Sequence, residues 1–143
     1  MKNIYFDMDG TIANLYGVNG WLDDIRNENV RPYREAKPLV NMNSLARVLN
    51  RLSRKGYKVS IISWTAKNGS EWYNEAVAEA KREWLRKHLA SVQFENVFIV
   101  PYGEPKGNYG FGVLFDDEKH NRDEWNGVAY DVNDIIGILK GLE

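Results

Sequence analysis

A buried strand that ends abruptly in two carboxylates constrains this 143-residue chain more than any other stretch. Residues 4–6 are apolar or aromatic and favour a β-strand, and Asp7 and Asp9 follow them directly, before Gly10 and Thr11. Carboxylates at the C-terminal end of a buried parallel strand open onto the crevice where open α/β sheets bind ligands. Asp7 and Asp9 point to the same side of an extended backbone, so they repel each other unless a cation or a shared proton intervenes.

The carboxylate pair predicts a site for Mg²⁺, with a substrate phosphate completing the coordination shell of the metal. An Asp beside such a metal can act as a nucleophile that forms an aspartyl-phosphate, and its neighbour can shuttle protons. A simple turn after the strand is an alternative, because turns favour Asp and Gly for backbone reasons. A calcium loop is excluded, since its sixth and twelfth positions require Gly and Glu where this chain has Ile12 and Val18.

Composition limits the class of protein. A chain of 143 residues, 43% hydrophobic and 27% charged, is typical of one soluble globular domain with a real core. The net charge of -1 gives no electrostatic reason to expect nucleic acid or an anionic membrane as a partner. The absence of cysteine excludes disulfides and cysteine-based zinc sites. No segment resembles a signal peptide or a membrane span, so we expect a cytoplasmic protein.

Strand-like runs alternate with helical stretches along the rest of the chain. The pattern predicts further strands at 58–63, 97–100, 113–115 and 127–130, and helices at 39–55, 70–89 and 132–142. Such alternation is typical of βαβ units around a parallel sheet with right-handed connections. In the longest helix we expect Ser70 to cap the start, and we expect Lys81 to belong to a basic C-terminal end that complements the helix dipole.

The stretch 14–38 is rich in Asn, Gly and aromatic residues and is longer than most loops of compact domains. We expect a small lid over the strand ends, with a short helix at 21–25 and without a core of its own. Five of its side chains are candidates for substrate contact: Tyr16, Trp21, Arg31, Tyr33 and Arg34. The alternative is that the apolar residues of the short helix simply pack onto the domain.

Polar residues also follow the other predicted strands. Ser63 ends the second strand, Lys106 lies in the Gly/Pro-rich loop after the third, and Asp116 and Asp117 follow the fourth. Each has an ordinary alternative, because Ser can end a strand, a lone Lys is usually solvated and Asp can cap a helix. However, parallel strands end at one edge of the sheet, so all these groups converge on the first carboxylate pair.

The converging groups suit phosphoryl transfer. The carboxylates are hard oxygen ligands for Mg²⁺, and Ser63 can donate a hydrogen bond to a phosphoryl oxygen. Lys106 would stabilise the negative charge that spreads over the phosphoryl oxygens. Asp7 would attack phosphorus in line, while Asp9 would protonate the departing oxygen and then activate water.

In this order, the groups resemble the four motifs of the haloacid dehalogenase superfamily: Asp7-Met8-Asp9-Gly10-Thr11, Ser63, Lys106 and Asp116-Asp117. The resemblance covers nearly the whole chain, and the first motif is the most specific. It implies one domain over 1–143 with a three-layer, Rossmann-like α/β fold, a mainly parallel five-stranded sheet and a lid insert after the first strand. It also implies Mg²⁺-dependent phosphoryl transfer through an aspartyl-phosphate on Asp7. Asp9 would be the acid/base, with its backbone carbonyl on the metal, and an Asp there points to phosphatases rather than dehalogenases.

Within the superfamily, Glu83-Trp84-Leu85, the Lys106 loop and Leu114-Phe115-Asp116-Asp117 are similar to the 5′(3′)-deoxyribonucleotidase branch. This similarity implies a phosphomonoester hydrolase that acts on nucleoside monophosphates. The alternatives are a phosphatase of sugar phosphates or other small metabolites, and a non-catalytic binding module that keeps the fold. A P-loop kinase is excluded, because the chain has no Gly-x-x-x-x-Gly-Lys-Ser/Thr motif.

The predicted site therefore has three groups of residues. The catalytic residues are Asp7 and Asp9, the metal ligands are Asp7, Asp9, Asp116 and Asp117, and the phosphate-binding residues are Thr11, Ser63, Trp64 and Lys106. Trp64, together with Tyr16 or Trp21 of the lid, offers an aromatic surface on which a nucleobase can stack. The expected partner is a small phosphorylated molecule, with no role for membrane or nucleic acid.

Overall fold

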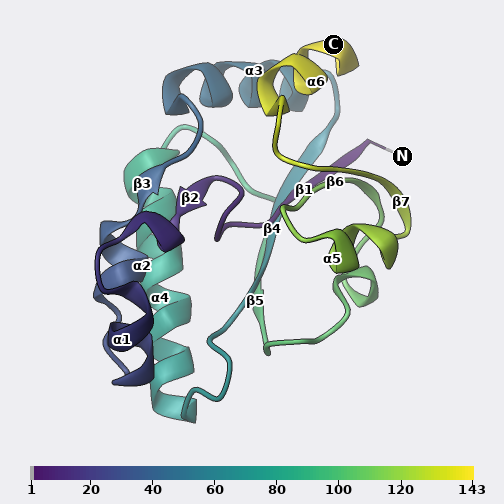
Figure 1. Ribbon diagram of the computed structural model, residues 1–143. Helices are drawn as coiled ribbons and strands as arrows, with labels where there is room; N and C mark the ends of the chain where they lie inside the picture. Colours follow the sequence, from purple (N-terminus) through teal and green to yellow (C-terminus); the bar gives the residue numbers. More distant parts are fainter. Residues whose placement is uncertain (1) are drawn as a thin grey trace.

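A five-stranded parallel sheet runs through the centre of the computed structural model, which describes residues 2–143 (Figure 1). Its strands are β1 (Asn3–Phe6), β4 (Lys58–Trp64), β5 (Asn96–Val100), β6 (Gly112–Phe115) and β7 (Gly127–Tyr130). They lie in the order β5-β4-β1-β6-β7, and every neighbouring pair is parallel. The predicted α/β, Rossmann-like sheet is confirmed, and the direction of winding reverses beside β1, where open sheets bind their ligands.

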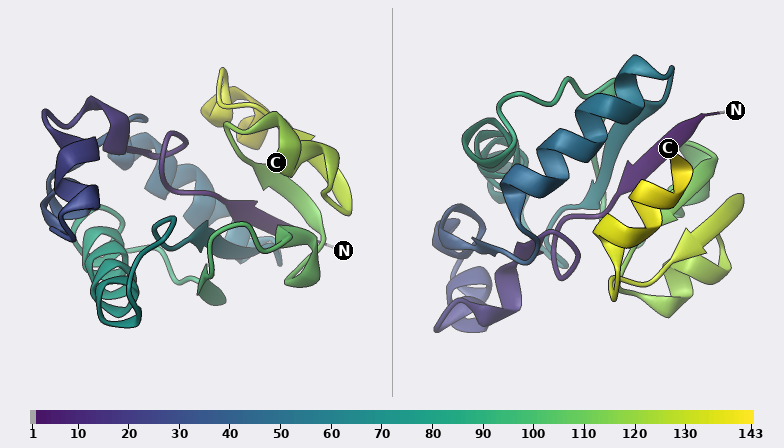
Figure 2. Two further views of the ribbon diagram at one scale, coloured as in Figure 1. Left: turned by 60° about the horizontal axis from the view of Figure 1, so that its bottom comes forward. Right: turned by 90° about the horizontal axis from the view of Figure 1, so that it is seen from above.

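Helices cover both faces of this sheet and make three layers. One face carries α3 (Met42–Arg54), α6 (Ile135–Leu142) and the C-terminal half of α4 (Glu71–His88), and α3 lies beside α6 (Figures 1 and 2). The other face carries the short α5 (Lys119–Asp123) and the loop that contains η2 (Lys106–Asn108). The apolar stripe predicted for α3 is confirmed, since four of its side chains are fully buried: Leu45, Val48, Leu49 and Leu52.

Alternate residues of each strand supply the two cores, because successive side chains of a strand point to opposite faces. Ile4 and Phe6 of β1 join the larger core beneath α3, α4 and α6. Tyr5, between them, joins the smaller core on the other face, where its ring meets Trp125 edge to face at 5.2 Å between centroids. A strand buried on both faces therefore carries the Asp-x-Asp motif.

Capping side chains set the helix starts, and they account for the differences from the predicted bounds. Ser70 caps α4 by accepting a hydrogen bond from the Tyr73 amide at 3.1 Å, as predicted. Asn41 and Asp134 cap α3 and α6 in the same way, so these helices begin three residues later than their hydrophobic patterns suggest. Within residues 2–143, no helix combines the length and the apolar character that crossing a membrane requires.

The predicted lid is present between β1 and α3. It consists of β2 (Ala13–Asn14), η1 (Leu15–Gly17), α1 (Trp21–Arg26), α2 (Arg31–Glu35) and β3 (Lys37–Pro38). The first and last elements of the lid, β2 and β3, pair with each other in antiparallel fashion. The helices α1 and α2 lie beside the N-terminal half of α4 (Figure 1). The lid and α4 share one apolar cluster of six buried residues: Leu15, Tyr33, Ala66, Tyr73, Val77 and Ala80.

Candidate active site

The C-terminal ends of β1, β4 and β6 bring the predicted residues to one edge of the sheet. The strand pairing continues just beyond β1 and β6, because the Asp7 amide donates to the Phe115 carbonyl at 3.0 Å and the Asp116 amide donates to Tyr130 at 3.1 Å. These backbone hydrogen bonds fix where the two carboxylates leave the sheet. The convergence expected of parallel strand ends is therefore present at the level of the backbone.

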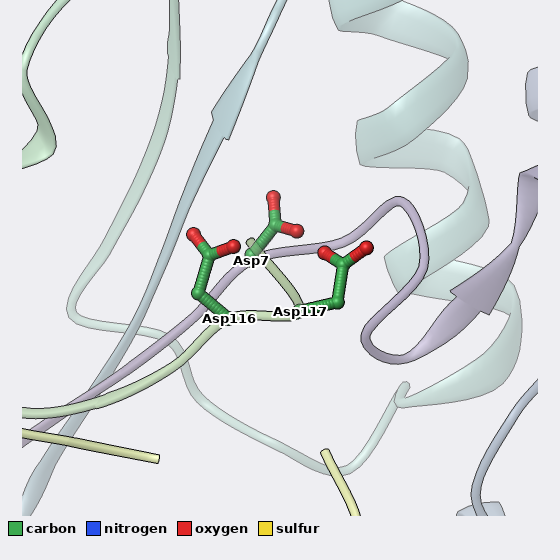
Figure 3. A group of neighbouring side chains, drawn as sticks. All are labelled: Asp7, Asp116 and Asp117. Atoms are coloured by element: carbon green, nitrogen blue, oxygen red, sulfur yellow. The ribbon is translucent and has the colours of Figure 1, made fainter. Parts of the chain in front are cut away.

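Three of the carboxylates lie together beside the end of β1. One oxygen each of Asp7, Asp116 and Asp117 lies within 4.8 Å of the other two, and the three side chains point to the same side (Figure 3). Thr11 supports this group, since its hydroxyl donates to Asp7 Oδ2 at 3.0 Å and accepts from the Asp117 amide at 3.2 Å. Such a set of hard oxygen donors suits Mg²⁺. The side chain of Asp9 is not part of the group.

Lys106 is buried and lies against the same carboxylates. Its Nζ donates to Asp7 Oδ1 at 3.0 Å and to Asp116 Oδ2 at 2.7 Å, so the solvated loop lysine considered as an alternative is excluded. Burial acts to lower the pKa of Lys106, but the two carboxylates outweigh it and raise the pKa. Asn121 of α5, which sequence reasoning missed, donates to Asp116 Oδ2 at 3.2 Å. Lys106 is therefore a fixed positive charge beside Asp7.

A second buried ammonium lies on the other side of the site. Lys81 of α4 is only 1% exposed, and its Nζ donates to Asp9 Oδ2 at 2.8 Å, to Ser63 Oγ at 2.7 Å and to the Trp64 carbonyl at 2.7 Å. Ser63 is likewise buried, so its predicted contact with phosphate stays a prediction. The expectation that Lys81 belongs to the basic end of α4 is wrong, because Lys81 points inward to the strand ends.

The register of α4 contains the signal that identifies Lys81. Tyr73 and Val77 precede it at four-residue intervals, and both are fully buried, so Lys81 falls on the buried face of the helix. The exposed basic residues of α4 begin beyond this face, at Arg86 and Lys87. Charge alone suggested a solvated lysine, whereas helical periodicity places it inside.

Burial and the repulsion of neighbouring carboxylates raise the pKa values of three acids of the site, Asp9, Asp116 and Asp117. Burial raises the pKa of Asp9, with Lys81 opposing the shift and Asp7 adding to it. Burial, followed by the charge of Asp7, raises the pKa of Asp116 to about 6 and that of Asp117 to about 8. When ionised, these four carboxylates face two buried ammonium groups, which leaves two excess negative charges (four minus two). One divalent cation would balance that excess.

A cleft of about 560 Å³ opens between the lid and the strand ends. Asp7, Asp9, Trp64 and Lys106 line it, whereas Thr11, Ser63 and Asp116 lie buried beneath it. The walls are rich in aromatic side chains: Tyr16, Trp21, Tyr33, Trp64 and Tyr102. The site can therefore present charged groups to a phosphate at its floor and aromatic rings to the rest of a substrate.

Four of the five aromatic residues of the cleft form two pairs, one on the lid and one between the end of β4 and the loop after β5. Tyr16 and Trp21 meet edge to face, with 5.0 Å between ring centroids. Trp64 and Tyr102 are also 5.0 Å apart, and the Trp64 indole donates to the Glu104 carbonyl at 2.9 Å. The hydrogen bond of Trp64 and the packing within each pair restrain the rings before any ligand binds.

Two arginines predicted to face a substrate do not line the cleft. Arg31 donates to Asp24 of α1 at 2.6 Å, which holds α1 against α2, and to Glu35 of its own helix at 3.2 Å. Arg34 is exposed on the outer side of α2. Both predictions fail because the faces of this short helix differ. Its buried residues are Pro32 and Tyr33, and of these Tyr33 lines the cleft.

No family model matches the sequence, and no curated protein sequence matches it either. Among solved structures, the chain is similar to D,D-heptose 1,7-bisphosphate phosphatase from Burkholderia thailandensis, with a TM-score of 0.57, 11% identity, and coverage of 99% of this chain and 98% of that one. It is also similar to the B. bronchiseptica enzyme in complex with magnesium and phosphate, with a TM-score of 0.51, 12% identity, and coverage of 87% and 74%. At these identities the likeness shows a shared fold.

Proposed function

We propose that this chain is a Mg²⁺-dependent phosphomonoester hydrolase that works through an aspartyl-phosphate on Asp7. The observation that carries the proposal is the surroundings of Asp7. Lys106 occupies one oxygen, Thr11 donates to the other, and the carboxylates of Asp116 and Asp117 lie within reach of the same cation. An Asp that served only in a turn after the strand would need none of these partners.

The donor set supports Mg²⁺ as the metal. The predicted ligands Asp7, Asp116 and Asp117 supply only oxygen, and when they are ionised they give the site an excess of negative charge over Lys81 and Lys106 that a divalent cation would offset. When bound, Mg²⁺ supplies positive charge to the phosphoryl oxygens and lowers the repulsion between the carboxylates and the incoming phosphate. Asp9 would contribute through its backbone, since its side chain is held by Lys81.

The residues of the site account for both halves of the reaction. The Asp7 carboxylate forms a bond to phosphorus as the bond from phosphorus to the leaving oxygen breaks, and protonated Asp9 gives its proton to that oxygen. Asp9 then takes a proton from water as the water oxygen attacks phosphorus, and the bond to Asp7 breaks to release inorganic phosphate. Lys106 stabilises the charge on the phosphoryl group in both halves. Burial raises the pKa of Asp9 toward the protonated form that the first half requires, and Lys81 opposes this shift.

Two substrate classes have support from different observations. The aromatic pairs Tyr16–Trp21 and Trp64–Tyr102 on the cleft walls support nucleoside monophosphates, because bases stack on aromatic rings. The two similar structures are phosphatases of a heptose bisphosphate, which supports sugar phosphates. We therefore propose small phosphomonoesters as the class, with these two as the candidates to be separated by assay.

The test is phosphate release from nucleotides, sugar phosphates and an aryl phosphate, with Mg²⁺ or with EDTA. The variant Asp7→Asn keeps the size of the side chain, and we expect it to abolish turnover while the melting temperature changes little. Asp123→Asn, on the surface of α5 outside the cleft, is the matched control and should keep full activity. Substantial activity in Asp7→Asn would remove Asp7 as nucleophile, and activity in EDTA would remove the metal.

A further inference from the structure

The ammonium of Lys81 joins the ends of two neighbouring strands. Of its three hydrogen bonds, one goes to Asp9 beyond β1, and two go to Ser63 and the Trp64 carbonyl at the end of β4. The lid contributes as well, because the Nζ atom lies 5.3 Å from the centre of the Tyr33 ring. Lys81 is thus the point where α4, both strand ends and the lid meet.

The three protons of the ammonium are all donated within the protein. Lys81 therefore has no proton left for a substrate unless one of these bonds breaks. Lys106 differs, since its ammonium donates to two carboxylates and it lines the cleft. Within residues 2–143, Lys81 is the one side-chain partner of the Asp9 carboxylate, and it occupies only Oδ2.

We propose that Lys81 is a positioning residue that holds the carboxyl group of Asp9 in place for proton transfer to the leaving group. This inference rests on the proposed function and deepens it. The Asp9 side chain is 20% exposed and lines the cleft, and its bond to Lys81 restrains the side-chain torsions. Within residues 2–143, the second oxygen of Asp9 has no side-chain partner and is left for the leaving group. A mobile Asp9 would have to be ordered in every catalytic cycle, which slows the step.

A structural role alone explains Lys81 poorly. An ammonium buried to 1% exposure costs desolvation energy, and an apolar residue of similar size commonly gives equal or greater stability at such a position. The neighbours of Lys81 on the same helix face, Val77 and Trp84, belong to the apolar cores. A buried charge at this position that is hydrogen-bonded to the predicted acid, Asp9, therefore supports a role for Lys81 in catalysis.

The leaving group provides a readout that a structural role would not move. When the leaving oxygen belongs to an alcohol, the bond to phosphorus breaks with transfer of the Asp9 proton, and the alcohol departs neutral. When it belongs to 4-nitrophenol, the oxygen departs as a stable anion and gains little from the proton. General acid catalysis contributes about 10²- to 10⁴-fold, so a misplaced Asp9 slows the first substrate far more than the second.

The experiment measures kcat/KM for an alkyl phosphate and for 4-nitrophenyl phosphate in Lys81→Met, in Asp9→Asn and in the double variant. This constant reports the transfer to Asp7, in which the leaving group departs, and not the later hydrolysis that both substrates share. We expect Lys81→Met to lose at least about tenfold more on the alkyl phosphate, in line with the size of general acid catalysis. Added to Asp9→Asn, the same change should cause little further loss, because the two residues act through one step. Lys87→Met, on the exposed side of the same helix, is the matched control and should leave both rates unchanged.

Equal losses on the two substrates, or additive losses in the double variant, would overturn the inference and make Lys81 a packing residue. If Lys81→Met does not fold, Lys81→Gln, which keeps a hydrogen-bond donor, takes its place. The same comparison applies, between the loss on the alkyl phosphate and the loss on 4-nitrophenyl phosphate. A wild-type protein that turns over neither phosphate would overturn the proposed function, and this inference with it. Wild-type turnover combined with equal losses would overturn the inference alone.

Discussion

Lys106 lies between the carboxylates of Asp7 and Asp116, with its Nζ 3.0 Å from the first and 2.7 Å from the second. The other oxygen of Asp116 accepts from the Glu118 amide at 2.9 Å, so Asp116 is held on both sides. Lys106 therefore bridges the predicted nucleophile, Asp7, and the predicted metal ligand at the end of β6, Asp116. No other buried cation touches Asp7 within residues 2–143.

We predict that Lys106→Met lowers kcat by about 10²- to 10³-fold, as expected for the loss of one preorganised charge at the phosphoryl group. Mg²⁺ binding should not weaken, since the change removes a positive charge that competes with the metal. Steady-state kinetics at saturating Mg²⁺ and calorimetric titration of the metal check the two parts. Lys119→Met, an exposed change on α5, is the control. A variant with weak metal binding and normal kcat would contradict the prediction.

Stability should fall with rising pH in the absence of metal. The folded-state pKa values of Asp116 and Asp117, about 6 and about 8, lie above the unfolded value of about 3.9. Between these values the folded chain binds more protons than the unfolded chain, so the free energy of unfolding decreases as pH rises. Melting temperatures from pH 4 to 8 should show this decrease, and Asp117→Asn should show less of it.

Mg²⁺ should oppose this loss of stability with rising pH. The metal binds the ionised carboxylates and so stabilises the fold by mass action above about pH 6, but it competes with protons at pH 5. The increase in melting temperature on adding Mg²⁺ should therefore be larger at pH 8 than at pH 5. An equal increase at both values would show that the metal binds away from these carboxylates.

Trp21→Ala should change substrate preference more than stability. Trp21 is half-buried, lines the cleft and contacts Tyr16, and base stacking on one aromatic ring contributes about 1–3 kcal/mol. We expect the ratio of kcat/KM for a nucleotide over an aryl phosphate to fall by about tenfold, which corresponds to about 1.4 kcal/mol. Trp72→Ala, which removes an exposed ring from α4, is the control. A large fall in melting temperature with unchanged kinetics would make Trp21 a packing residue.

The sequence predicts much of this fold because local pattern and strand polarity agree. Strand β1 is apolar or aromatic from Ile4 to Phe6, and α3 has one apolar face. The polar residues after the strands meet because parallel strands end together. The ribbon β2–β3 was missed, since its two strands have two residues each and lie far apart in the sequence, with Ala13 paired to Pro38 and Asn14 to Lys37. Patterns of period two need longer runs to be recognised.

Lys81 and Asn121 were missed for a different reason. Both lie on helices. The charge of Lys81 suggested a solvated surface although helical periodicity places it on the buried face of α4, and the sequence around Asn121 is polar. Their roles come from a carboxylate brought close by the fold, Asp9 for Lys81 at 2.8 Å and Asp116 for Asn121 at 3.2 Å. Buried polar groups of this kind are specified by tertiary partners rather than by local pattern.

The lid is joined to α4 through main-chain atoms as well as through their shared apolar cluster. Glu28 accepts two hydrogen bonds from Ser70, both at 2.8 Å, and the Tyr73 hydroxyl donates to the Asn29 carbonyl at 2.9 Å. Farther along the helix, the Trp84 indole donates to the Ala36 carbonyl at 2.7 Å. A chimera that replaces the lid alone would leave these donors without acceptors, so the transplantable module is the lid together with α4. Substrate range in such hybrids should follow that joint module, whose helix also carries Lys81.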